Sequence, residues 1–110
     1  MLQQVANILQ RGSDGATGEQ VTRLLESPGF RLERIVSKGE ATAIGFWYDQ
    51  PEAEWVLLFR GSAVLTFEGD RSLNLASGDS LVIPAHSRHR VDSCSRDALW
   101  LALHYRAGEK

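Results

Sequence analysis

The sequence predicts a single, mainly β domain with a short amino-terminal helix. Three observations support this class. From residue 30 onward, short apolar runs alternate residue by residue with polar positions, as in strands that bury one face. Gly, Asp, Pro and Ser separate these runs every ~8 to 12 residues, which favours a sandwich or closed barrel. The expected strands are 31–37, 41–48, 54–60, 63–68, 71–74, 80–83, 89–92 and 99–105.

Length and composition set the organisation of the chain. It has 110 residues, of which 43% are hydrophobic and 24% charged, as expected for one globular domain with one core. No repeat or low-complexity tract divides it. We therefore expect an amino-terminal arm and helix over residues 1–29, followed by the β-barrel over residues 30–106.

The expected helix lies in the arm. The stretch 17–20 has Thr and Gln three residues apart, as in a capping box, and Val21, Leu24 and Leu25 then share one helical face. Pro28 disfavours helical backbone at the residue before it, so the helix should end near residue 27.

Charge and cysteine content exclude several classes of partner. The formal net charge is −2 and the cations are scattered, so the chain lacks the basic stripe that nucleic acids require. No apolar run reaches the roughly 20 residues of a membrane helix. Cys94 is the single cysteine and fits a reducing compartment, so we expect a cytoplasmic protein without a disulfide. Its neighbours predict a turn and an unreactive thiol.

Alternation along two strands places polar side chains inside the domain. Glu54 shares a face with Val56 and Leu58, and His89 shares a face with Val91. A buried carboxylate is costly unless a cation or hydrogen-bond donors compensate it. An inward Glu54 and an inward His89 therefore mark the candidate site.

These two segments resemble the motifs of the cupin family. Glu54 and Gly61 have the spacing of the Glu and the final Gly of the first motif, and Gly78, Pro84 and His89 are spaced as in the second. The resemblance covers roughly residues 30 to 105. It implies a double-stranded β-helix, or jelly-roll barrel, often dimeric, with a divalent metal held by a His-x-His pair, a Glu and a His.

Only part of the family's ligand set is carried over. Glu54 and His89 match the motif Glu and the second-motif His, whereas Tyr48 and Gln50 stand where the His pair would be. His86 replaces the usual turn Gly, and we expect it to be exposed. Asp49 should point away from Gln50, outside the barrel.

The expected ligand pocket is therefore Tyr48, Gln50, Glu54, His89 and His104. His104 is included because it shares a strand face with Trp100 and Ala102. Four of these residues, Gln50, Glu54, His89 and His104, form the expected metal set. Mixed nitrogen and oxygen donors suit Fe, Mn, Ni or Zn.

The sequence leaves three functions open. The first is a metal-dependent enzyme acting on a small polar molecule. The second is a metal-free module that binds or senses a small ligand. The third is a barrel in which Glu54 and His89 only form a buried hydrogen-bonded pair. A homodimer is expected because residues 1 to 30 are partly apolar and lie outside the barrel motifs.

Overall fold

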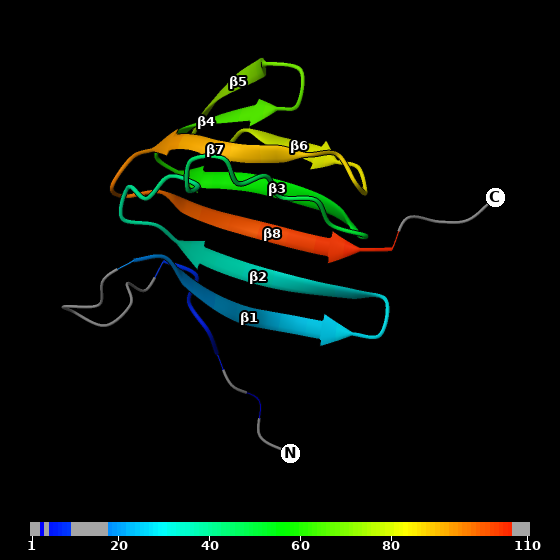
Figure 1. Ribbon diagram of the computed structural model, residues 1–110. Coiled ribbons are helices and arrows are strands. Elements are labelled where there is room, and N and C mark those ends of the chain that lie inside the picture. Colours follow the sequence, from blue (N-terminus) through cyan, green and yellow to red (C-terminus); the bar gives the residue numbers. More distant parts are fainter. Residues whose placement is uncertain (1–2, 4, 10–17, 107–110) are drawn as a thin grey trace.

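The structure is a computed structural model that describes residues 3, 5–9 and 18–106 (Figure 1). Its eight strands form two antiparallel sheets. The first sheet contains, in spatial order, β1 (Gln20–Ser27), β2 (Phe30–Val36), β8 (Leu99–Tyr105), β3 (Ala53–Arg60) and β6 (Ser80–Ile83). The second contains β5 (Arg71–Ala76), β4 (Ser62–Phe67) and β7 (His89–Cys94).

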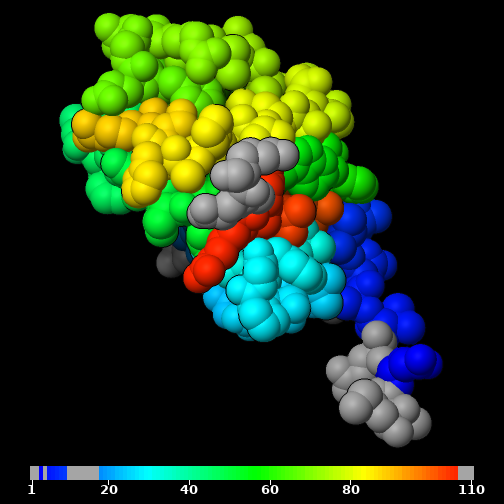
Figure 2. Space-filling view, turned by 90° about the vertical axis from the view of Figure 1, so that its right-hand side faces the viewer, coloured from blue at the N-terminus to red at the C-terminus, as the bar shows by residue number. Residues whose placement is uncertain are grey.

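The two sheets enclose one apolar core. In Figure 2 the red end of β8 lies between the cyan β1–β2 hairpin and the yellow and green residues of the strands beyond it, in the order of the first sheet. Leu58 of β3 is fully buried, and it clusters with Leu65 and Phe67 of β4 and with Trp100 and Ala102 of β8. Alternation along β3 and β8 thus directs every second side chain toward the second sheet. The predicted mainly β class is confirmed, in the form of two sheets.

The prediction of an amino-terminal helix is wrong. The described part of the expected helix is strand β1, whose residues pair with β2 from Gln20↔Val36 to Ser27↔Phe30. The cap residue Thr17 lies outside the described residues. Pro28 and Gly29 form the two-residue loop of this hairpin. Pro and Gly favour a turn after a strand as well as the end of a helix, so they did not distinguish the two. Pairing with β2 overrides the weak helical periodicity of so short a segment.

The strand predicted over 41–48 is also absent. This segment runs beside β7 and makes one isolated bridge, between Tyr48 and His89. A turn interrupts it, with Phe46 N–H donating to the Ala43 carbonyl and Gly45 at φ +85°. The left-handed backbone at Gly45 breaks the extended conformation that a continuous strand requires.

The chain passes from one sheet to the other at Gly61. This residue separates β3 from β4 and has φ +101°, a conformation that favours glycine. A Cβ here would overlap Ser95 Oγ and lie 3.0 Å from Ala98 Cα. The Gly of the first motif is therefore required by both backbone conformation and close approach.

A tight hairpin loop joins β4 to β5, with Gly69 at φ +97° and Asp70 at φ +68°. Among the described residues, no helix is long and apolar enough to span a bilayer.

Candidate functional site

Strand register assembles a polar row on the inner face of the first sheet. Arg31 of β2 is paired with His104 of β8, His104 is paired with Glu54 of β3, and Glu54 is paired with Ile83 of β6. Side chains directly opposite each other on paired strands share a face. Glu33, two residues after Arg31, lies diagonally from His104 on the same face. The site is thus built by register, from residues far apart in the sequence.

His89 reaches the same cavity from the second sheet. Its Nδ1 lies 2.8 Å from the carbonyl oxygen of Ser87, and a carbonyl only accepts, so Nδ1 carries the ring hydrogen. In the neutral ring Nε2 then presents a lone pair, 3.9 Å from Glu54 Oε1. Tyr48 stacks against the His89 ring with centroids 5.6 Å apart. The predicted meeting of Glu54 and His89 inside the domain is seen in the structure.

Glu54 is a buried carboxylate with little compensation. The residue is 8% exposed, and no hydrogen bond from a described residue reaches its oxygens. The two imidazoles that flank it lie 3.9 Å and 3.8 Å away, beyond hydrogen-bonding distance. Burial, reinforced by the negative charge of Glu33, raises the pKa of Glu54 to about 7. The side chain can therefore hold or release a proton near neutral pH.

His104 lies on the other side of Glu54. Its Nε2 is 3.3 Å from Glu33 Oε1 and 3.8 Å from Glu54 Oε2. Burial, followed by the positive charge of Arg31, lowers the pKa of this imidazole. Its Nδ1 is buried without a hydrogen-bond partner among the described residues. His104 turns inward as predicted, and the lowered pKa favours the neutral ring.

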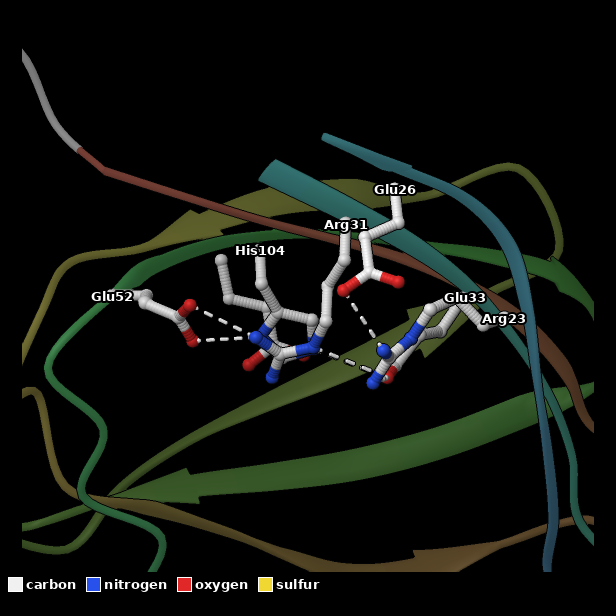
Figure 3. Close-up of polar contacts among 7 residues, drawn as sticks. Arg23, Glu26, Arg31, Glu33, Glu52 and His104 are labelled. Atoms are coloured by element: carbon white, nitrogen blue, oxygen red, sulfur yellow. Dashed lines mark hydrogen bonds and ion pairs between the residues drawn. The ribbon is translucent and has the colours of Figure 1, made fainter. Parts of the chain in front are cut away.

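Arg31 organises the carboxylates around the row, as Figure 3 shows. Its Nη1 lies 2.9 Å from both carboxylate oxygens of Glu52, and its Nε lies 3.2 Å from Glu33 Oε2. Although burial disfavours the charged form, these hydrogen bonds and charges raise the pKa of the guanidinium. Arg31 is therefore a fixed cation bound to two carboxylates.

A cavity of about 220 Å³ lies between the sheets at this row. It has the liquid volume of roughly seven water molecules, enough for a small polar molecule. Its walls combine apolar side chains with convergent polar groups, as small-molecule sites do. All five residues predicted for the pocket line it: Tyr48, Gln50, Glu54, His89 and His104.

Sequence reasoning missed Arg31 and Glu33. The segment 31–35 alternates, which places Arg31, Glu33 and Ile35 on one strand face. The opposite face also carries a charge, Arg34, so period two alone could not show which face was internal. The sequence feature that could have identified the inner face is Ile35, an apolar residue on the same strand face as Arg31 and Glu33.

The predicted metal set is brought together only in part. His89, with Nδ1 bound to a carbonyl and Nε2 free, has the orientation of a metal-bound histidine, and the carboxylate of Glu54 faces it. His104 Nε2 instead faces Glu33. Among the residues that the structure describes, no three His, Cys, Asp or Glu side chains form a group able to hold a metal ion. The described residues therefore do not make a complete metal site, and the four-ligand set stays a prediction.

The remaining candidates lie at the edge of the site or outside it. His86 is exposed, as expected, and its Nδ1 lies 2.8 Å from Asp49 Oδ1. Cys94 was expected in a turn, but it ends strand β7 and its half-buried thiol lines the cavity. Its Sγ donates to the Glu40 carbonyl at 3.2 Å.

No protein-family model matches the chain, and no curated protein matches it significantly. Among solved structures, it is 41% identical to a "putative mannose-6-phosphate isomerase" of Ralstonia eutropha JMP134, with a TM-score of 0.88, covering 94% of this chain and 99% of that one.

Two more distant structures show the same fold. An RmlC-like cupin of Shewanella frigidimarina NCIMB 400 has a TM-score of 0.70 at 20% identity, covering 87% of this chain and 83% of that one. An RmlC-like cupin of Desulfovibrio desulfuricans has a TM-score of 0.75 at 17% identity, covering 94% and 97%. Together with the motif residues Glu54 on β3, Gly61 between β3 and β4, and His89 on β7, these similarities show that the chain has the cupin fold.

Proposed function

We propose that this protein binds a small polar molecule in the cavity between its sheets, held by Glu54 and His89. One observation carries the proposal: the buried carboxylate of Glu54 faces the cavity without a hydrogen bond from any described residue. A buried polar group normally has a partner, because an unsatisfied one costs on the order of 1 to 3 kcal/mol. A hydroxyl group between Glu54 and His89 would donate to the carboxylate or to the free Nε2.

The proposed ligand is a small hydroxylated molecule. The relative that is 41% identical is named for an isomerase of a sugar phosphate, and this name supports a sugar-like ligand here. Isomerisation of such compounds moves a proton between neighbouring carbons, which requires an acid-base group that works near neutral pH. Glu54 has that property, so we include proton transfer on the bound molecule as the candidate reaction.

A thermal-shift screen of sugars, polyols and small acids tests the binding proposal. A ligand should raise the melting temperature of the wild-type protein, and the shift should be lost in Glu54→Gln and His89→Ala. His86→Ala is the matched control, since it removes an exposed imidazole in the turn between β6 and β7 that does not line the cavity, and it should keep the full shift. Equal shifts in all four proteins, or no shift across a broad set, would refute this use of the cavity.

A divalent metal is the second candidate, and the His89 contact with the Ser87 carbonyl favours it. Glu54 and His89 would be two ligands, with Gln50 and His104 as the other members of the predicted set. Elemental analysis of untagged protein from metal-supplemented medium should then find stoichiometric Fe, Mn, Ni or Zn that disappears in His89→Ala. A metal-free wild-type protein would reject the metal and leave the ligand proposal standing.

We also propose a cytoplasmic homodimer. β1 is an outer strand of the five-stranded sheet, and Val21 and Leu25 on it are 53% and 55% exposed. Light scattering at tens of micromolar should give twice the monomer mass. A monomer mass at that concentration would reject the dimer.

A further inference from the structure

The charges lining the cavity are strongly unequal. Among the described residues, four carboxylates line it, those of Glu19, Glu33, Glu40 and Glu54, together with a single guanidinium, that of Arg31. Its two histidines, His89 and His104, add no charge when neutral. The cavity therefore has a negative potential that any ligand must meet.

Arg31 is already engaged by two carboxylates, which compensate its charge. Its Nη1 lies 2.9 Å from both oxygens of Glu52, and its Nε lies 3.2 Å from Glu33. A phosphate or carboxylate ligand would have to displace these two carboxylates to pair with it. An incoming anion would also lie against Glu54, at close range and with little water to screen the repulsion.

An unpartnered buried group shows that this acidity faces a ligand position. Glu54 is 8% exposed and lines the cavity, and no described donor bonds to its carboxylate. Its carboxylate therefore meets the contents of the cavity rather than a donor of the described residues. The unmet requirement is for a hydrogen-bond donor, and a positively charged donor satisfies it best.

We propose that the cavity selects a ligand bearing an ammonium group and rejects phosphorylated or otherwise anionic molecules. This inference rests on the proposed function, that the cavity binds a small polar molecule, and it assigns the charge of that molecule. The ammonium group would lie against Glu54, with the neutral part of the ligand along Tyr48 and the apolar wall.

The reactivity of Cys94 can report the electrostatic potential of the cavity even when the ligand is unknown. Cys94 is the chain's single cysteine, and its half-buried thiol lines the cavity. Aminoethyl, methyl and sulfonatoethyl methanethiosulfonates transfer cationic, neutral and anionic groups to a thiol. Their rates are measured at pH 8.5 with EDTA present and divided by the rates on the urea-unfolded chain.

The cationic reagent should react about tenfold faster than the anionic one after this normalisation, as expected for a cavity whose described lining has more carboxylates than cations. Glu40→Gln should reduce the ratio, while Glu68→Gln, at an exposed carboxylate outside the cavity, should not. A ratio of one, a preference for the anionic reagent, or no reaction with any reagent would overturn the proposal.

A matched series of sugars separates this inference from the proposed function. Glucosamine, glucose and glucose 6-phosphate share a ring and differ in charge, and calorimetry should rank their affinities in that order. Tighter binding of glucose 6-phosphate would overturn the charge assignment while supporting the cavity as a ligand site. A cationic preference at Cys94 with no binding by any sugar would support the charge assignment and count against the proposed function.

Discussion

Replacing Glu54 with glutamine removes the central carboxyl group of the polar row and keeps the shape of the side chain. Burial and Glu33 raise the pKa of Glu54 from 4.5 to about 7, so the folded protein holds this proton more tightly than the unfolded chain. Below pH 4.5 both states are protonated, and Glu54 has no effect on the pH dependence of stability. As the pH rises from 4.5 to 7, only the unfolded chain releases the proton, so the free energy of unfolding falls. Above pH 7 the loss is complete.

The size of this loss follows from the two pKa values. At ~1.4 kcal/mol for each pH unit between them, the wild-type protein should lose about 3 to 4 kcal/mol across the window. Glu54→Gln cannot ionise. It should be within about 1 kcal/mol of the wild type at pH 4.5 and about 2 to 4 kcal/mol more stable at pH 8.

Urea unfolding at half-unit pH steps from 4 to 8 measures this difference directly. Subtracting the two curves cancels titrations that both proteins share. Glu68→Gln is the control, because Glu68 and its partner Arg88 are both largely exposed and such pairs contribute little. Parallel curves for the wild type and Glu54→Gln would refute the account of a desolvated carboxylate.

Three further substitutions test the fold that positions the site, each by urea unfolding. Gly61→Ala should lower the free energy of unfolding by about 2 to 4 kcal/mol, because a side chain at φ +101° is strained and would also overlap its neighbours. Gly69→Ala has open space around it and should lower it by only ~1 kcal/mol. Equal losses in the two variants would show that steric overlap at Gly61 contributes nothing. Leu58→Ala empties the fully buried centre of the core and should cost about 3 to 5 kcal/mol, and a loss below ~1 kcal/mol would contradict that packing. His86→Gly should stabilise the protein by about 1 kcal/mol, since His86 has φ +62° where only glycine is unstrained; a loss of stability would show that the exposed imidazole contributes more than the backbone strain.

Much of the site could be predicted because strands impose a simple rule. Alternation placed Glu54 beside Val56 and Leu58 on the inner face, and the same rule placed His89 and His104 there. Each prediction required only a correctly assigned strand and one apolar residue two positions from the polar residue, on the same face. The cupin spacing added that the strands carrying Glu54 and His89 face one another.

The rest depended on long-range pairing that no local pattern specifies. Segment 20–27 has helical spacing, yet β2 offers it a partner and it becomes β1. Arg31 and Glu33 enter the site because β2 pairs with β8 in one register, which sets Arg31 opposite His104. A shift of one residue would turn both side chains outward. The turn at Gly45 shows the opposite case, in which a single local glycine ended a strand that alternation had extended to Tyr48.

The most direct test of the cavity as a ligand site is ring-nitrogen NMR of the three histidines during ligand addition. The structure predicts that His89 carries its hydrogen on Nδ1, and that the nitrogens of His89 and His104 shift when glucosamine or another stabilising ligand is added. His86, exposed beside Asp49, should not move. A His89 protonated on Nε2 alone, or shifts confined to His86, would contradict the account.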